Sequence, residues 1–323
     1  MEGSTFRKTI IKLNVRNIKK MELPPSVSVN HVAIHGIYAD AEFEKCRVAL
    51  KYLTNYKKGV KTESKLYFSM DYEILIEDMK KNPKFQDTAI MLFKSSRSPL
   101  IVVNHKYVIN PSHLYKLMLE NHDYEDKSPM FIYKRLAVTE YARYFQENKQ
   151  FEYVYMDFII NFERHSIPQR VVFALDVQNA PKTCKNFIEL IKGTHTGPDG
   201  QKLHYKDTLI HKVWKNGFIQ GGDVEHQKGK GGQSIYGKYF EDENYVLKHD
   251  MPGLLGMASN GLRHTNNSQF YVTLIPMPSY DNKFVVFGRV VEGFRVIKLI
   301  NKLTSYGTKP QYEIRVHDCG MYH

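Results

Sequence analysis

The sequence predicts a two-domain α+β protein, in which an α/β domain precedes a closed antiparallel β-barrel capped by two helices. A length of 323 residues suits two domains. Apolar runs typical of strands alternate with helical patterns up to residue 123. From residue 151 onward, short strand-like runs crowd together and only two stretches are helical. We therefore divide the chain into a basic arm (1–27), an α/β domain (28–123), a connector (124–150) and a barrel domain (151–323).

The α/β domain contains two strand–helix pairs followed by a hairpin and a last helix. Asp40 is the expected cap of the first helix, and Pro111 lies in the first turn of the last one. The expected strands are 31–37, 65–70, 88–93 and a pair turning at Asn104–His105, and the expected helices are 40–56, 71–82 and the segment after Pro111. This order is thioredoxin-like, and residues 98–104 resemble the segment around the cis-proline of glutaredoxins.

The redox chemistry of a thioredoxin-like domain is not expected. It requires a nucleophilic cysteine at the start of the first helix, where the helix N-terminus lowers the pKa of the thiol. Residues 38–41 read Tyr-Ala-Asp-Ala instead, and Cys46 falls well inside the helix. We interpret Cys46 as a small core residue and the domain as redox-inert and suited to docking.

The chain is basic, with 46 Lys and Arg against 34 Asp and Glu, a formal charge of +12. Such a surplus favours an acidic partner: nucleic acid, anionic lipid or an acidic protein surface such as tubulin. Within the arm, residues 9–20 alternate apolar and polar types, which permits strand pairing with a partner or with the chain itself; a disordered tail is the alternative. The connector carries Ala137, Tyr141, Tyr144 and Phe145 on one face of a predicted helix.

Several classes of site and location are not indicated. No apolar run reaches about 20 residues and no secretory signal is recognisable, so a cytoplasmic location is expected. Cys46, Cys184 and Cys319 form neither a disulfide framework nor a zinc site. The run GKGKGGQS lacks the spacing of a phosphate-binding loop, and no RNA-recognition signature is present. The histidines show no metal-ligand spacing, and we expect neither metal nor cofactor; these histidines are His204, His211, His226, His249 and His264.

The second domain contains eight strand-like runs and two helical stretches. The runs are 154–160, 170–177, 207–214, 218–223, 253–259, 269–274, 284–291 and 312–320, and the helices are 180–193 and 293–303. Seven segments in order resemble the cyclophilin family of peptidyl-prolyl cis-trans isomerases: APKTCKNF, FIQGGD, GKGGQSIYGKYFEDEN, GLLGMAS, NNSQFYVTL, FVVFGRVVEG and the terminal DCG. The order of a thioredoxin-like domain, an interdomain helix and these segments is similar to that of one cyclophilin subgroup. This subgroup contains peptidyl-prolyl isomerase-like protein six and similar radial-spoke cyclophilins of motile cilia.

The resemblance implies an eight-stranded antiparallel barrel and a particular chemistry. Rotation about an Xaa-Pro bond faces a barrier of about 18–20 kcal/mol. Cyclophilins lower it with an apolar pocket for the proline ring, an arginine, a glutamine and several aromatic residues. No nucleophile, metal or cofactor is required, because the site acts by stabilising the transition state of this rotation and not the ground state.

Matching positions give the candidate site residues. Lys212, in place of the arginine, and Gln220 are the catalytic candidates. The peptide-binding candidates are Phe218, Ala258, Ser259, Gln269, Tyr271, Tyr280 and Phe284. Phe218 replaces a methionine, and Gly217 stands where the family has a pocket phenylalanine. Ser279 and Tyr280 stand at the positions of a tryptophan–leucine pair, and Phe284 stands at the position of a histidine on the pocket rim.

These replacements lead us to expect weak or undetectable isomerase activity. Lysine keeps the charge of arginine but lacks its planar fork of donors, and loss of an oriented donor costs about 10²–10³ in rate. The leading hypothesis is an interaction component of motile-cilia axonemes that binds proline-containing segments. The alternatives are an active isomerase that assists protein folding or assembly, and a nucleic-acid-associated cyclophilin.

Overall fold

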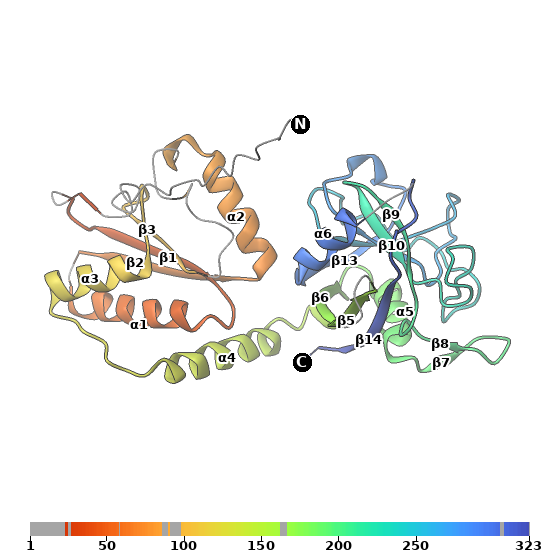
Figure 1. Cartoon of the computed structure of the whole chain (residues 1–323), viewed down its shortest axis with the longest axis horizontal. Coiled ribbons are helices and arrows are strands. Elements are labelled where there is room, and N and C mark those ends of the chain that lie inside the picture. The colour runs from red at the N-terminus through yellow and green to blue at the C-terminus, as the bar shows by residue number, and fades with distance from the viewer. Residues whose placement is uncertain are drawn as a thin grey trace, which may run out of the picture. The chain divides into compact units, whose positions relative to one another are not determined.

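The computed structural model describes residues 23–24, 27–57, 59–85, 90, 98–161, 167–303 and 307–322. The chain forms two compact units: one comprises the residues up to Tyr67 and Asp71–Tyr141, the other Phe68–Met70 and the residues from Ala142 onward (Figure 1). The predicted arm (1–27) and the predicted strand 88–93 lie almost entirely outside the described residues. No described helix is long and apolar enough to cross a membrane.

The first unit contains a four-stranded sheet with strand order β2-β1-β3-β4. β1 runs parallel to β2 and antiparallel to β3, and β3 and β4 form a hairpin. Its elements are β1 (His31–Ile37), α1 (Ala41–Tyr56), β2 (Lys61–Tyr67), α2 (Ser69–Lys81), β3 (Leu100–Val103), β4 (Tyr107–Ile109), α3 (Pro111–His122) and α4 (Met130–Glu147), which continues into the second unit. This is a mixed α/β unit, and its thioredoxin-like identity stays a prediction. Every described peptide bond is trans, including the one before the proline in the segment 98–104.

Both faces of this sheet are covered. Val32 and Ile34 pack with Phe43 of α1 on one face, whereas Ala33 packs with Tyr72 and other residues on the opposite face. The predicted strand 65–70 was placed too late in the chain, since β2 begins at Lys61 and ends at Tyr67. β2 is an edge strand that exposes most of its first residues, so its polar sequence carries no apolar alternation to detect.

Local features of α1 follow from its sequence. The side chain of Asp40 accepts a hydrogen bond from the backbone N–H of Glu42, as expected of a helix cap. Cys46 is fully buried, and its Sγ lies 3.3 Å from the hydroxyl of Tyr115. Burial raises the pKa of the Cys46 thiol to about 12, so it stays protonated at neutral pH.

The second unit is the antiparallel barrel that the sequence predicts. Its eight-stranded sheet has the order β14-β5-β6-β13-β11-β12-β10-β9. The elements are β5 (Phe151–Ile160), β6 (Gln169–Asp176), α5 (Pro181–Lys192), β9 (Ile210–Trp214), β10 (Phe218–Gly221), β11 (Leu254–Met257), β12 (Phe270–Thr273), β13 (Val286–Glu292), α6 (Phe294–Lys302) and β14 (Ile314–Met321), with a small hairpin of β7 (His195–Thr196) and β8 (Lys202–Leu203).

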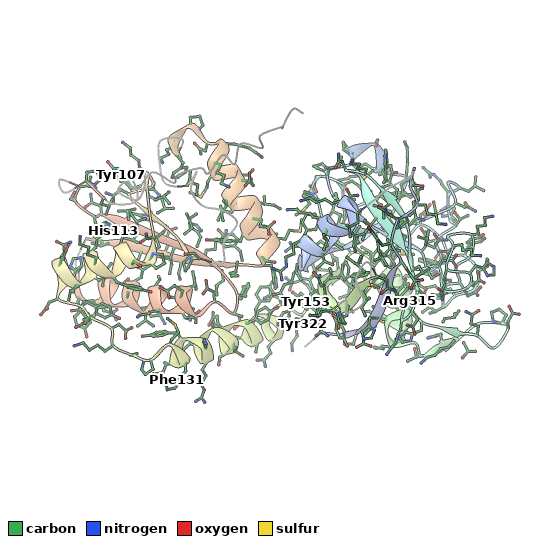
Figure 2. The ribbon with its side chains drawn as sticks, in the orientation of Figure 1. Tyr107, His113, Phe131, Tyr153, Arg315 and Tyr322 are labelled. Carbon is green, nitrogen blue, oxygen red and sulfur yellow. The ribbon has the colours of Figure 1, made fainter. Side chains whose placement is uncertain are left out.

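The two edge strands of this sheet approach one another and nearly close the barrel. An isolated antiparallel bridge joins Leu209, just before β9, to Arg315 of β14. Arg315, labelled in Figure 2, donates from Nη1 to the carbonyl oxygen of Asp207 at 2.8 Å. The two predicted helices pack on the barrel, α5 against β6, β13 and β14 and α6 against β6, β9 and β10. The β9–β10 hairpin lies at this closing edge of the sheet, and its outer face carries the candidate site.

Candidate peptide-binding groove

The β9–β10 hairpin sorts its side chains into two faces. Lys212 pairs with Gln220 and Trp214 pairs with Phe218 across the two strands. Directly opposed residues share a face, and residues two apart along a strand share it as well. These four side chains therefore lie on the outer face of the sheet, while Val213 and Ile219 between them are fully buried in the barrel. We call this outer face the groove, because the family resemblance implies that a peptide binds there.

Gln220 and Gln269 form a hydrogen-bonded pair at one end of the groove. Gln220 donates from Nε2 to Oε1 of Gln269 at 2.8 Å. Gln269 then donates from Nε2 to the carbonyl oxygens of Gly231 and Gly229, at 2.7 and 3.2 Å. Each amide is thus oriented by the next, so the catalytic candidate Gln220 is held in place by the loop 223–232.

Asp223 organises this loop. Its fully buried carboxylate accepts from the backbone N–H groups of residues 225, 226, 228, 229 and 231 at 2.7–3.2 Å. Burial alone would raise the pKa of Asp223, but these donors hold it below its ordinary value. Gly229 and Gly232 have φ values of 80° and 116°, which favour glycine. The glycines of this run therefore form turns around a carboxylate. We call this loop, with Gln220 and Gln269, the polar half.

The remaining predicted contact residues gather in one apolar cluster. Phe218, Ala258, Tyr271 and Met277 are buried together, and Tyr280 and Phe284 pack against them. The ring centroids of Phe218, Tyr271 and Tyr280 are 5.8–6.1 Å apart, and those of Tyr280 and Phe284 are 4.7 Å apart. These are contact distances for aromatic rings, so the rings leave no space between them, and Tyr280 and Phe284 are the partly exposed members that a ligand can touch. We call these six residues the aromatic platform.

A buried chain of hydrogen bonds supports Tyr271. Its hydroxyl lies 2.6 Å from Nε2 of His249, and Nδ1 of His249 lies 2.8 Å from Oδ1 of Asp281. Burial lowers the pKa of His249 despite the opposing carboxylate. With Asp281 accepting from Nδ1–H, Nε2 of the neutral imidazole accepts a hydrogen bond from the Tyr271 hydroxyl. Neither His249, whose spacing from the other histidines only excluded a metal site, nor Met277 was among the residues expected from the sequence.

Lys212 and Ser259 complete the predicted set. Nζ of Lys212 lies 5.4 Å from the centroid of the Phe218 ring, within cation–π range. None of the described carboxylates is paired with this ammonium. Its charge therefore lies over the Phe218 ring without a carboxylate partner among the described residues. Ser259 follows Ala258 just after β11, and its hydroxyl accepts from the backbone N–H of Gly261 at 3.4 Å.

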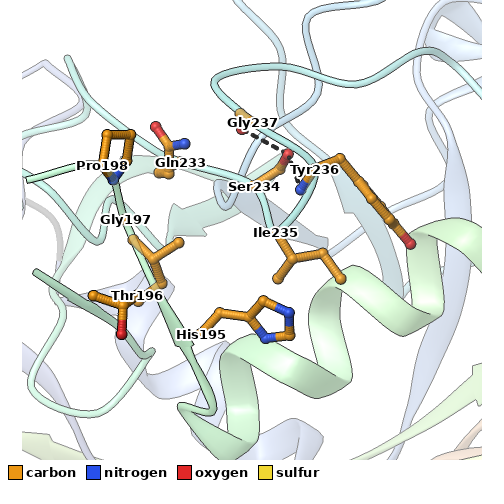
Figure 3. A pocket seen from close by; sticks show the side chains of 10 residues that line it. His195, Thr196, Gly197, Pro198, Gln233, Ser234, Ile235, Tyr236 and Gly237 are labelled. Atoms are coloured by element: carbon orange, nitrogen blue, oxygen red, sulfur yellow. Dashed lines mark hydrogen bonds between the residues drawn. The ribbon is translucent and has the colours of Figure 1, made fainter. Parts of the chain in front are cut away.

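A cavity of about 320 Å³ shares no lining residue with the groove. It is lined by His195, Thr196, Gly197, Pro198, Leu203, Gln233, Ser234, Ile235, Tyr236 and Gly237 (Figure 3). Ser234 donates from Oγ to the carbonyl of Gly237 and accepts from the N–H of Tyr236, so this hydroxyl is engaged within its own turn. We therefore assign the candidate site to the β9–β10 groove.

Comparisons with known proteins agree with this geometry. The family model described as "Cyclophilin type peptidyl-prolyl cis-trans isomerase/CLD" matches residues 159–321. A Homo sapiens protein named "Probable inactive peptidyl-prolyl cis-trans isomerase-like 6" is 38% identical over 226 residues, which cover 70% of this chain and 71% of that protein. The "NK-tumor recognition protein" of Mus musculus is 49% identical over 155 residues, which cover 47% of this chain but 11% of that protein.

Among solved structures, a cyclophilin type peptidyl-prolyl cis-trans isomerase from Cryptosporidium parvum is 36% identical, with a TM-score of 0.46. The match covers 54% of this chain and 98% of that one. The family match spans half of the chain, and the human relative matches more than two thirds of both proteins. The chain therefore belongs to the cyclophilin-type peptidyl-prolyl cis-trans isomerase family.

Proposed function

We propose that this cyclophilin binds proline-containing segments of other proteins and catalyses their isomerisation weakly or not at all. The observation that carries the proposal is the contrast between an ordered glutamine pair and a replaced cation. Gln220 is held by Gln269, whereas Lys212 presents a single ammonium over the Phe218 ring. An ammonium is a point charge and lacks the planar fork that orients an arginine toward the prolyl amide.

The relatives support the same view of catalysis. Two proteins that match about 70% of this chain at 38% identity, from Homo sapiens and Mus musculus, are named probable inactive isomerases. A groove that retains its peptide-orienting amides and its apolar surface still has the parts that binding requires. Binding and catalysis separate here, because catalysis requires extra stabilisation of the twisted amide that binding does not.

Catalysed cis-trans exchange of a proline tetrapeptide tests the proposal. We expect the full chain to accelerate exchange little, Lys212→Ala to leave that rate unchanged, and Lys212→Arg to raise it about tenfold or more. Lys302→Ala, at an exposed lysine of α6, is the matched control and should behave like the wild type. A robust wild-type rate that collapses in Lys212→Ala would instead establish an active isomerase.

We further propose a setting for this activity: the cytoplasm, and there the axoneme of motile cilia, as a radial-spoke component docked by the basic arm and the first unit. The subgroup resemblance supports this setting, and the charge of +12 suits an acidic protein surface. Fractionation of motile cilia tests it: the protein should stay with detergent-extracted axonemes and be released by high salt. Recovery solely from the soluble fraction, or tight salt-sensitive RNA binding, would reject the setting.

A further inference from the structure

We propose that Trp214 is a peptide-contacting residue that supplies the aromatic wall of the groove in place of the missing side chain at Gly217. We also propose that the ligand is a proline-containing segment with an acidic residue next to the proline. This inference rests on the proposed function, because it assigns the chemistry of the segment that the groove binds. Trp214 belongs neither to the residues carried over from the family motif nor to the hydrogen-bonded polar half.

The indole ring lies over Gly217. A Cβ atom built on Gly217 would approach Cδ2 and Cε3 of Trp214 to 3.0 and 3.1 Å, which is closer than ordinary contact. The same ring meets Phe218 edge to face, with centroids 5.5 Å apart and planes at 88°. Trp214 therefore occupies the space beside the aromatic platform that a larger residue at position 217 would claim.

The backbone around Trp214 is held firmly. Its carbonyl oxygen accepts from the N–H of Gly217 and from Nδ2 of Asn301 on α6, both at 2.9 Å. Oδ1 of Asn301 in turn accepts from the N–H of Asn216 at 2.9 Å. One asparagine thus fixes both ends of the short turn, so the indole is presented from a rigid support and loses little freedom on binding.

Half of this ring is open to solvent. Trp214 is 48% exposed. Ile275 is 46% exposed, and the residue before it, Leu274, donates from its backbone N–H to the carbonyl oxygen of Gly217. A large ring held rigid and half exposed beside an aromatic platform has the character of a binding contact, since tryptophan is enriched among the residues that dominate interfaces. Proline-rich segments bind to such aromatic surfaces in an extended conformation.

The charge beside the ring indicates the rest of the ligand. Lys212 lies on the same face two residues before Trp214, with its ammonium over Phe218 and unpaired with any described carboxylate. A ligand carboxylate next to a proline on the indole would supply the missing partner, and complementary charge sets the preference among similar peptides.

Trp214 is the one tryptophan of the chain, so the intrinsic fluorescence of the full-length protein reports on it alone. Three peptides serve as probes: Ac-Ala-Glu-Pro-Phe-NH2, its Gln-Pro analogue and its Glu-Ala analogue. We expect the Glu-Pro peptide to move the emission to shorter wavelength and to bind more tightly than the Gln-Pro peptide by about fivefold. Lys212→Gln should abolish that preference, and the Glu-Ala peptide should leave the emission unchanged.

Calorimetry with variants completes the test. Trp214→Ala should weaken binding of the Glu-Pro peptide about tenfold or more, whereas Trp214→Phe should stay within about threefold. Gly217→Phe in the Trp214→Ala background should recover affinity, because it returns an aromatic wall from the neighbouring position and Gly217 has no positive φ. Tyr239→Ala, at a tyrosine that is 44% exposed, is the matched control and should bind like the wild type.

The outcomes separate this inference from the proposed function. Suppose that Trp214→Ala binds the Glu-Pro peptide as tightly as the wild type, and that this peptide does not move the emission of the wild type. Trp214 then has no role, although the groove binds peptides. Equal affinity for the Glu-Pro and Gln-Pro peptides overturns the acidic preference. If calorimetry detects no binding of either proline peptide to the wild type, the proposed function fails and the inference fails with it.

Discussion

The polar half and the aromatic platform adjoin in one groove, yet they differ in how they match the family pattern. Gln220 and Gln269 keep the family's residue types, whereas Phe218, Tyr280 and Phe284 replace residues of other shapes. Hydrogen bonds are directional, and a buried donor left without a partner costs about 1–3 kcal/mol. Apolar contacts are non-directional, and cores accept swaps of similar volume. The polar half is therefore constrained atom by atom. The platform is constrained mainly in total volume, with Tyr271 as its exception, since the hydroxyl of that residue is hydrogen-bonded to His249.

Asp223→Ala should produce the largest effect, because it removes a charged acceptor shared by five backbone N–H groups, of which that of Gly231 is buried and the others are partly buried. We expect the free energy of unfolding to fall by about 4 kcal/mol or more, since a hydrogen bond to a charged group contributes about 1.5–3 kcal/mol and the partly buried donors regain some of it from water. Thermal denaturation of the full chain measures this. Asp199→Ala, at an exposed aspartate, is the control and should change stability by less than about 0.5 kcal/mol. A loss as small as in Asp199→Ala would show that the loop does not depend on Asp223.

Phe218→Ala tests the platform and should have the next largest effect. Phe218 is 5% exposed and touches the rings of Trp214, Tyr271 and Tyr280. Removing it should cost about 3–4 kcal/mol through lost contacts and a cavity. Phe218→Met, which installs the family's own residue type, should cost less than about 1.5 kcal/mol. Equal losses in the two variants would show that volume alone does not constrain the position of Phe218.

A graded and smaller effect is expected with pH. The pKa of Asp223 is depressed in the folded state, so its contribution to stability is complete above the ordinary aspartate pKa of about 4. That contribution is lost as the pH falls through the lower folded-state pKa. The stability difference between the wild type and Asp223→Asn should therefore be constant from pH 7 to about 4 and shrink below it. A difference that stays constant down to pH 2 would exclude Asp223 as the titrating group.

Periodicity and local signals were sufficient for much of the fold. Eight apolar runs became the eight strands of the barrel sheet, Pro181 begins α5, Gly193 ends it with a positive φ, and Asp40 caps α1. Each of these depends on residues close together in the chain. The edge strand β2 was misplaced for the opposite reason: its exposed polar residues resemble a loop, and only pairing with β1 makes them a strand.

For the candidate site, the sequence by itself determined which residue types were available, because the motif positions carry Lys212, Gln220, Gln269 and Tyr271 in recognisable surroundings. Only the tertiary structure decided that His249 and Asp281, 32 residues apart, support the Tyr271 hydroxyl, and that the Trp214 ring covers Gly217. Hydropathy treats Trp214 as one more strand residue. Its role arises from the twist and register of a hairpin that places the ring beside Phe218, and no local pattern encodes such a contact.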